Sequence, residues 1–425
     1  MTDTIVDVLV QIAGEDIPAG RLWAHPHGRK GSATFAYLPE YLARGDSYEL
    51  DPRLAEHTGQ QQTAEGQALF GAFSDAAPDG WGRRLVLRNE IHHAEKHDVP
   101  ERDIPEIDYL LGVRDQLRQG ALRFRNPADG TYLADNRSDV PQLLDLRRLL
   151  AAAEQLERDQ ETDEDLRLLL EGGSSLGGAR PKAHVLDTQG QLSIAKFPAP
   201  ENDKWDVIRW EAAALTLARA AGLEVPQFRL HEIAGRPVLI VRRFDRGGGG
   251  RVGYVSAMTL LESKDGAEGS YVEIAETIEE HSPAASADLR ELWRRIVFSR
   301  LISNTDDHLR NHGFLRTSTA GWSLSPAFDL NPNPQAQGRG FSTMIEQRRG
   351  GSDIEAAIEL AGLFRLTPPQ ALAAIEEVDR ATSNWRAVAK AVGLEPGALE
   401  RMAGAFENDE VRIARELLSS TTTGR

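Results

Sequence analysis

The sequence contains no cysteine among its 425 residues. Disulfides, iron–sulfur clusters and thiolate zinc sites are therefore excluded, and a cytoplasmic protein is the expectation. It also has no run of about 18 apolar residues, so we expect no membrane-spanning segment. The first residues, M-T-D-T-I-V-D-V, lack the basic and apolar regions of a secretory signal. The length is enough for two or three globular domains.

Basic residues are outnumbered, with 49 Lys and Arg against 65 Asp and Glu and a net charge of −16. A protein that binds nucleic acid tightly on its own needs a basic face to neutralise phosphates. The composition therefore argues against autonomous DNA binding. Contact with DNA through a basic partner remains compatible with it, and the charge otherwise keeps the protein soluble.

The spacing of apolar residues predicts mixed strands and helices up to about residue 246 and mostly helices beyond it. The expected strands are 5–12, 183–186, 191–197, 229–233, 237–244 and 321–325. The expected helices are 80–97, 103–117, 141–156, 161–171, 205–223, 271–281, 286–303, 353–363, 368–391 and 395–418. A mixed half followed by a helical half is typical of a two-lobed kinase, although this pattern alone does not define a function.

A glycine- and serine-rich stretch, E-G-G-S-S-L-G-G-A-R-P-K, occupies residues 171–182. Small residues let backbone N–H groups approach phosphate oxygens, and Lys182 can add a positive charge. The stretch does not fit the Walker A pattern, and a flexible linker is the alternative interpretation. Lys196 ends an apolar strand, where it must either reach solvent or pair with an anion. In protein kinases such a lysine holds ATP phosphates and pairs with a helix glutamate, for which Glu211 is the candidate.

The most specific pattern is N-T-D-D-H-L-R-N at residues 304–311. The spacing Asp306-x-x-x-x-Asn311 is that of a kinase catalytic loop, in which the aspartate orients the substrate hydroxyl and the asparagine binds magnesium. Asp329 follows a predicted strand, where a second magnesium-binding aspartate is expected. Magnesium prefers hard oxygen ligands, so one Asp, one Asn and the ATP phosphates suffice.

Each element also has a structural interpretation. N-T-D-D-H could be a turn or a helix cap, Asp329 could cap the turn that follows it, and His308 could be a structural histidine. The occurrence of the loop, the strand lysine and D-x-x-x-x-N in this order nevertheless favours a kinase.

Several segments resemble the HipA family of bacterial kinases. They are S-S-L-G-G-A-R-P-K-A (174–183), I-A-K-F-P (194–198), L-A-R-A-A-G-L-E-V-P (217–226), R-R-F-D-R (242–246), N-T-D-D-H-L-R-N-H-G-F (304–314), L-S-P-A-F-D-L (324–330) and, nearer the N-terminus, F-A-Y-L-P-E-Y-L-A-R-G (35–45) and D-G-W-G-R-R-L (79–85). The resemblance implies a two-lobed, protein-kinase-like α+β fold. It predicts an N-terminal subdomain at 1–125, a kinase N-lobe at 126–246 and a helical C-lobe at 247–425.

The resemblance also implies a function. The family is the toxin half of a type II toxin–antitoxin pair, a serine/threonine protein kinase that uses ATP and Mg²⁺. It phosphorylates a protein target, described for aminoacyl-tRNA synthetases, and so arrests translation and growth. The expected partner is a helix-turn-helix antitoxin of the HipB type, through which alone the chain would reach operator DNA, and no membrane contact is implied.

The site residues follow by resemblance. Asp306 matches the catalytic aspartate, and Asn311 and Asp329 match the magnesium ligands. Ser175, or Ser174 beside it, matches the serine whose autophosphorylation inactivates the kinase. The residues expected to contact the nucleotide are Gly177, Gly178, Ala179, Arg180, Lys182, Lys196, Arg242, Arg243, Phe244, His308, Asn311 and Asp329. The family commonly has Glu at the position of Arg242, but adenine is met there largely by backbone groups, so we expect binding to survive.

Two other functions stay open. A small-molecule phosphotransferase related to the aminoglycoside kinases would share D-x-x-x-x-N and the later aspartate, but not the loop serines or the N-terminal subdomain. A degenerate kinase fold that serves as a co-repressor would have lost a lysine, the aspartate or a metal ligand, and none is lost here.

Overall fold

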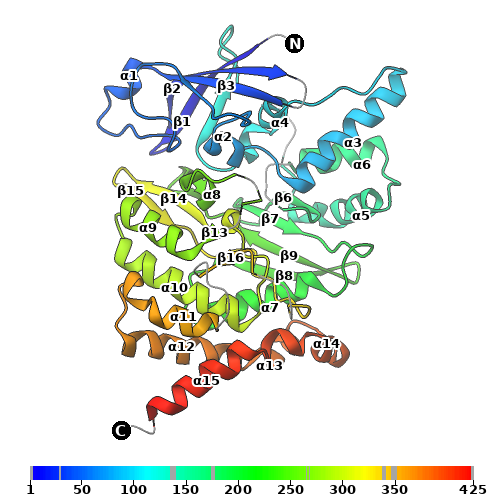
Figure 1. Cartoon of the computed structure of the whole chain (residues 1–425). Helices are drawn as coiled ribbons and strands as arrows, with labels where there is room; N and C mark the ends of the chain where they lie inside the picture. The colour runs from blue at the N-terminus through cyan, green and yellow to red at the C-terminus, as the bar shows by residue number, and fades with distance from the viewer. Residues whose placement is uncertain are drawn as a thin grey trace. The chain divides into compact units, whose positions relative to one another are not determined.

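A computed structural model describes residues 3–27, 30–134, 140–173, 178–264, 266–267, 269–336, 341–345 and 352–422. The chain forms two compact units. Figure 1 labels its helices and strands. The first unit contains residues 1–202, 232–262 and 315–319, and the second contains 203–231, 263–314 and 320–425. Helices and several sheets occur together, which confirms the α+β class. The division at residues 125 and 246 stays a prediction.

The first unit opens with a five-stranded sheet of order β4-β3-β2-β1-β5. Its strands are β1 (Thr4–Ile12), β2 (Glu15–His27), β3 (Lys30–Tyr37), β4 (Gln61–Gln62) and β5 (Leu122–Arg125). The predicted strand 5–12 is thus confirmed. Ala13 and Gly14 join β1 to β2 with φ of 50° and 85°. Two left-handed residues give the hairpin a twist that matches its antiparallel strands.

Short helices and aromatic side chains complete this part of the first unit. The helices are α1 (Pro39–Leu42), α2 (Gly71–Asp75), α3 (Gly80–His97) and α4 (Glu106–Gly112), followed by the 3₁₀ turn η1 (Asp115–Leu117). The predicted helix 80–97 is α3, whereas the predicted helix 103–117 is interrupted at Val113, whose backbone is extended. Phe73 packs against both Phe35 of β3 and Phe124 of β5, with ring centroids 5.8 and 6.0 Å apart. These rings form the core under the sheet.

A second sheet in the first unit carries the predicted lysines. β6 (Lys182–Leu186), β7 (Leu192–Lys196) and β9 (Arg236–Arg242) are antiparallel neighbours, while β8 (Phe228–Ile233) begins in the second unit and ends in the first. The 3₁₀ turn η2 (Leu143–Asp145) leads into α5 (Leu146–Glu157), which packs beside α6 (Asp163–Glu171). Leucines of both helices, Val185, Phe197 and Trp81 form one buried apolar cluster. This cluster anchors the sheet.

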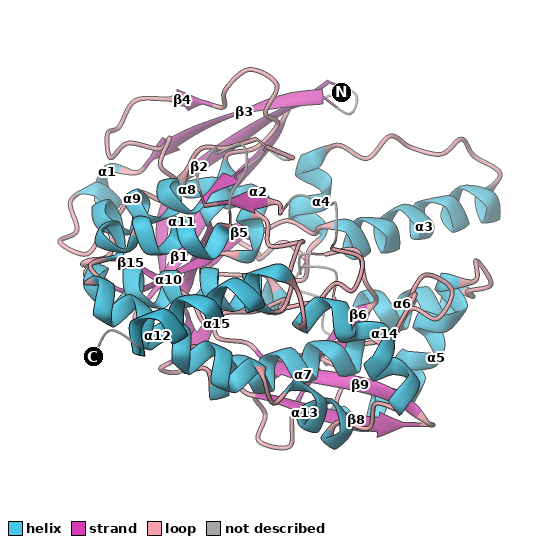
Figure 2. Ribbon diagram, turned by 60° about the horizontal axis from the view of Figure 1, so that its bottom comes forward, coloured by secondary structure: helices cyan, strands magenta, loops and turns pink. Residues whose placement is uncertain are grey.

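The second unit is mostly helical. Its α-helices are α7 (Val207–Ala220), α9 (Tyr271–His281), α10 (Ala285–Leu301), α11 (Asp353–Glu359), α12 (Pro368–Thr382), α13 (Trp385–Ala391), α14 (Pro396–Phe406) and α15 (Asp409–Thr422). Buried α10 packs against α9, α11 and α12, and Figure 2 shows α12 and α15 side by side. The remaining short elements of the chain are β10 (Arg246–Gly247), β11 (Gly250–Arg251), β12 (Gly253–Ser256), α8 (Ala257–Leu260), β13 (Gly269–Ser270), η3 (Leu309–Asn311), β14 (Gly313–Ser318), β15 (Gly321–Leu324), β16 (Thr343–Met344) and η4 (Ala361–Phe364).

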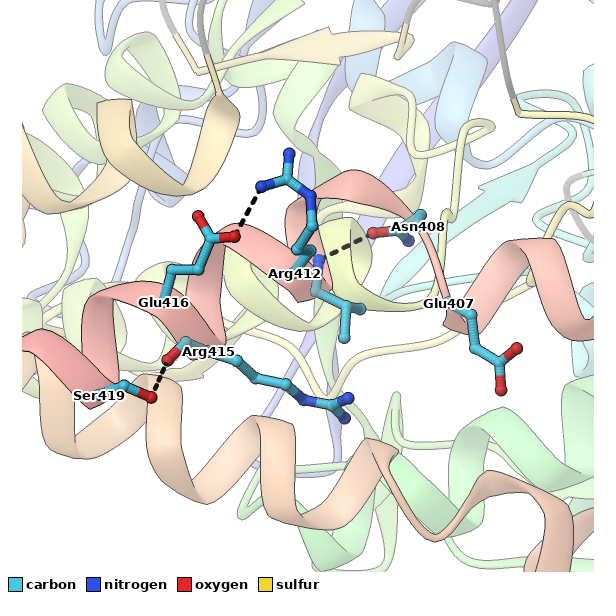
Figure 3. Close-up of a pocket in the computed structure, with 7 residues that line it drawn as sticks. Glu407, Asn408, Arg412, Arg415, Glu416 and Ser419 are labelled. Atoms are coloured by element: carbon cyan, nitrogen blue, oxygen red, sulfur yellow. Dashed lines mark hydrogen bonds and ion pairs between the residues drawn. The ribbon is translucent and has the colours of Figure 1, made fainter.

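Two predicted helices are each divided in the structure. The helix expected at 368–391 breaks at Ser383 and Asn384, and the one expected at 395–418 breaks at Glu407 and Asn408. Asn408 explains the second break. Its Oδ1 accepts from Val411 N at 2.9 Å in the first turn of α15 (Figure 3). Its Nδ2 donates to Arg300 O at 3.1 Å. The amide therefore ties the junction to the end of α10.

A shallow hollow of about 530 Å³ runs along α15 (Figure 3). It is lined by Glu407, Asn408, Val411, Arg412, Arg415, Glu416 and Ser419. It contains none of the predicted site residues. Across the described ranges, no helix has the length and apolar character needed to cross a membrane.

Candidate active site

Two predicted phosphate-contacting lysines form a cross-strand pair in the first unit. Lys182 of β6 lies directly opposite Lys196 of β7 in the antiparallel register. Directly opposed residues project from the same face of a sheet, and like charges in that position repel each other. Lys182 is 7% exposed. The register thus places two positively charged residues on one face of the sheet, which fits phosphate recognition.

The end of the glycine-rich loop lies against Lys182. Gly178 has φ of +92°, and a Cβ placed on it would come within 2.8 Å of Lys182 Nζ. The left-handed backbone therefore favours glycine at this position, and the close approach places the Lys182 ammonium against the end of the loop. Ala179 and Arg180 follow, and only Pro181 separates these three predicted nucleotide contacts from Lys182. The predicted contact Gly177 and the predicted phosphosites Ser174 and Ser175 lie outside the described residues.

The start of the same loop is fixed by buried polar groups. Arg114 donates to the carbonyl of Glu171. The backbone N of His184 donates to the carbonyl of Gly172 at 2.7 Å, and its Nδ1 lies 2.9 Å from the same oxygen. Arg243 donates in turn to His184 Nε2 at 2.9 Å. Sequence reasoning missed His184 because a single histidine in a strand carries no pattern.

Residues 242–244, predicted to hold the adenine side of ATP, use their side chains for contacts with other residues of the first unit. The Arg243 side chain is 3% exposed and donates to Asp245 Oδ1 at 2.8 Å. Burial would raise the pKa of Asp245, but the charges of Arg243 and Arg246 outweigh it and hold that pKa well below its ordinary range. Arg242 donates to Gln191 Oε1 at 2.8 Å, and the Phe244 ring faces Tyr254 with centroids 6.4 Å apart. Arg243 is thus a structural anchor for this strand end.

The predicted catalytic loop lies in the second unit after α10. Asp306 is exposed, whereas the adjacent Asp307 is buried. Tyr271 and Ser299 donate to Asp307 Oδ2, the second at 3.0 Å, and His312 Nε2 lies 3.1 Å from its Oδ1. Burial alone would raise the pKa of Asp307, but the charge of His312 and these hydrogen bonds hold it well below its ordinary range.

Asn311 is bonded to the predicted catalytic residue. Its Nδ2 donates to Asp306 O at 2.9 Å, and its backbone N donates to His308 O at 2.8 Å within the tight turn η3. Because the amide nitrogen is committed to a carbonyl acceptor, Oδ1 points away from that carbonyl as a hard acceptor. This is the atom that a magnesium ion would use.

Asparagine side chains join the Asp329 segment to the catalytic loop. Asn331 N donates to Asn304 Oδ1 at 3.3 Å, and Asn333 Nδ2 donates to Thr305 Oγ1 at 2.8 Å. Asp329 itself has φ of 59°, which is left-handed for a residue with a Cβ. Such backbone conformations cost free energy and persist where the surroundings impose them. The structure therefore brings the segments of Asp306, Asn311 and Asp329 together in one unit.

Asp329 and Asn311 are the residues near the catalytic loop that were predicted to bind a metal ion. Among the residues with described positions, no cluster of three or more His, Cys, Asp or Glu side chains could hold a metal ion. A carboxylate from Asp329 and an amide oxygen from Asn311 are nevertheless hard donors of the kind that Mg²⁺ accepts together with phosphate and water oxygens. The residues present therefore fit a nucleotide-bound magnesium rather than an all-protein metal cage.

Comparison with known protein families identifies the family of this chain. Residues 10–102 match the HipA N-terminal domain, and residues 174–385 match the HipA-like C-terminal domain. The chain belongs to the HipA family. A HipA solved as the "Shewanella oneidensis MR-1 Toxin Antitoxin System HipA, HipB and its operator DNA complex" covers 98% of this chain and 97% of its own, with 14% identity and a TM-score of 0.66. The HipA fold is therefore confirmed.

Curated relatives of this HipA-family chain are more similar in sequence. A "Putative kinase" of Haemophilus influenzae is 27% identical over 38% of this chain and 54% of its own length. "Putative kinase Y4dM" of Sinorhizobium fredii is 30% identical over 32% of this chain and 36% of its own. "Putative kinase Y4mE" of the same organism is 26% identical over 71% of this chain and 72% of its own. The chain thus spans about half or less of the first two relatives.

Proposed function

We propose that this HipA-family chain is an ATP-dependent kinase that transfers a phosphoryl group to a serine or threonine of a protein. The observation that carries the proposal is the exposed Asp306 on a loop whose neighbour Asp307 is buried, with Asn311 bonded to the Asp306 carbonyl. Asp306 is exposed to solvent, while Asp307 and Asn311 make the contacts that hold the loop. Its carboxylate would orient and accept the proton of the attacking hydroxyl.

The other predicted residues have matching roles. Lys182 and Lys196 would contact ATP phosphates, since their opposed ammonium groups favour an anion. Asp329 and Asn311 would hold Mg²⁺, which neutralises charge on the transferred group when bound. The γ-phosphorus–oxygen bond of ATP breaks as a bond to the acceptor oxygen forms, ADP leaves, and the hydroxyl proton passes to the Asp306 carboxylate. This assigns positioning and proton transfer to the chain's own residues.

The biological setting of the proposal comes from the family. We propose a toxin that arrests translation and growth, acts in the cytoplasm and inactivates itself at Ser175 or Ser174. A phosphoserine there adds about −1.5 to −2 charges and would compete with ATP phosphates for the loop. The HipA of Shewanella is in a complex with HipB and operator DNA. A HipB-like helix-turn-helix antitoxin is accordingly the proposed partner, and the net charge of −16 supports DNA contact only through it.

Incubation with γ-labelled ATP and Mg²⁺ tests the kinase. We expect self-labelling and labelling of a protein acceptor, and Asp306→Asn should lower the rate by about 10²–10⁴-fold. Asp129→Ala is the matched control, because Asp129 is an exposed carboxylate that accepts two hydrogen bonds from Thr131. An Asp306→Asn protein with the wild-type rate would refute the assignment, and labelling of small molecules alone would indicate the small-molecule phosphotransferase.

A further inference from the structure

Residues at the start of α3 form hydrogen bonds with the C-terminal end of the glycine-rich loop. Asp79 precedes α3, and its Oδ1 accepts from Gly80 N at 2.8 Å while its Oδ2 accepts from Gly178 N at 3.1 Å. Trp81 N donates to Gly178 O at 3.0 Å, and Trp81 Nε1 donates to Lys182 O at 2.9 Å. The backbone of Gly178 and of Lys182 is therefore hydrogen-bonded to Asp79 and Trp81, at the start of another element.

The contact is also sterically close. A Cβ on Gly80 would lie 3.0 Å from Ala179 Cα and 3.2 Å from Ala179 Cβ. Such distances leave no room for a side chain without displacing the loop. Trp81 is 1% exposed and belongs to the same apolar cluster as the sheet that carries Lys182. The segment thus has both the hydrogen bonds and the packing needed to set the position of the loop end.

An ionic ladder keeps α3 itself in place. Its basic members, spaced by four residues along one face of α3, are Arg84, Arg88, His92 and Lys96. Its acidic members, at alternate positions from the last residue of α5 to the first residue of α6, are Glu157, Asp159, Glu161 and Asp163. Arg84 lies 2.6 Å from Glu157, and Arg88 lies 2.5 Å from Glu161. His92 and Lys96 lie 3.1 and 2.7 Å, respectively, from Asp163. The pairs with the buried carboxylates of Glu157 and Glu161 contribute most to holding the helix, because exposed ion pairs contribute little.

We propose that residues 79–81 are a latch that holds Gly178–Lys182 in the conformation that binds ATP phosphates, with Asp79 as the positioning residue. The proposal rests on the proposed nucleotide binding and deepens it. Asp79 touches no reacting atom. It restricts the conformations of the loop end in the absence of nucleotide, so that less conformational entropy is lost when ATP binds. Loss of the latch should weaken ATP binding more than the transfer step.

Two variants separate the latch from the helix cap. Asp79→Ala removes both acceptors, whereas Asp79→Ser keeps a side-chain oxygen that can cap α3 but is too short to bridge to Gly178. We expect both variants to raise the KM for ATP about tenfold, with kcat within about threefold of wild type and faster amide hydrogen exchange at residues 178–182 without nucleotide. Asp129→Ala should match wild type in all three measurements.

The outcomes are separable. If both Asp79 variants fold, as judged by circular dichroism, and keep the wild-type KM and exchange rates, the latch is rejected. If only Asp79→Ala is affected, the role of Asp79 is that of a helix cap and the latch is again rejected. If wild type itself binds no ATP, the proposed function fails instead, and the exchange rates alone then decide whether residues 79–81 restrain the loop.

Discussion

The guanidinium of Arg243 donates a hydrogen bond to Nε2 of His184, 2.9 Å away, and both side chains are buried. Arginine can only donate, so Nε2 is the acceptor and the ring proton lies on Nδ1. Nδ1 then donates to Gly172 O at 2.9 Å. Burial, and next the positive charge of Arg243, hold the pKa of His184 well below its ordinary range. A neutral histidine thus anchors the start of the glycine-rich loop.

His184 makes the stability of the first unit depend on pH. It stays neutral when folded but takes up a proton below about pH 6.5 when unfolded. The unfolded state then binds more protons, so the free energy of unfolding falls by up to about 1.4 kcal/mol per pH unit as the pH drops from 6.5 to 5. Denaturant titrations of wild type and His184→Gln across pH 5–8 measure this. Equal pH slopes in the two proteins would contradict it.

Asp306 and Asp307 are adjacent but should separate activity from stability. Asp307→Asn breaks the buried contacts with Tyr271, Ser299 and His312, and we expect a loss of about 3–5 kcal/mol in the free energy of unfolding. Asp306→Asn, at an exposed position, should change it by less than about 0.5 kcal/mol while slowing phosphoryl transfer by about 10²–10⁴-fold. Urea titrations and ATP-labelling of both variants test this, and a stable Asp307→Asn protein would overturn the anchor role.

Asp307 gives a pH dependence of the same sign as that of His184 but in a more acidic range, because the unfolded state again binds more protons than the folded state. A carboxylate with a depressed folded pKa contributes stability that is present above the unfolded pKa, near 3.9, and lost as the pH falls towards the folded value. Asp307→Asn should therefore be less sensitive than wild type to acid below about pH 4. A wild-type acid transition in that variant would show that other carboxylates dominate.

The ionic ladder on α3 offers an internal comparison. Glu161 has a side chain with 0% exposure, and Arg88→Met leaves it without its shortest ion-pair contact, which we expect to cost about 1.5–3 kcal/mol. Lys96→Met removes a partner of Asp163 where both side chains are more than half exposed, so the cost should stay below about 0.5 kcal/mol. Chemical denaturation at low and high salt measures both. If both substitutions lowered the free energy of unfolding equally, burial would not determine how much these ion pairs contribute to stability.

Asp329 combines a left-handed backbone with a proposed metal ligand. Asp329→Gly keeps a backbone that glycine adopts freely, while Asp329→Ala should be about 1 kcal/mol less stable than the glycine variant because of φ at 59°. Both lose the carboxylate, so both should lose Mg²⁺-dependent transfer. Unfolding and a Mg²⁺ titration of the labelling reaction separate the two effects, and an active Asp329→Gly protein would remove Asp329 from the metal site.

The sequence by itself determined the elements whose signals are local. The predicted helix 271–281 is α9 residue for residue, because Ser270 and Glu273 form a capping box at its start. The predicted helix 80–97 is likewise α3. The order of the glycine-rich loop, Lys196 and D-x-x-x-x-N was also readable, since chemistry requires those residue types at that spacing.

Only the tertiary structure decided which distant partners each residue meets. The spacing to Asn311 singles out Asp306 in the sequence, but only packing shows that the adjacent Asp307 is buried among Tyr271, Ser299 and His312 while Asp306 is exposed. The break at Asn408 depends on the carbonyl of Arg300, more than a hundred residues away. The hydrogen bond from Gly178 N to Asp79 likewise joins residues that are far apart along the chain. Local propensity carries no information about such partners, because they meet only when the apolar faces between them are buried.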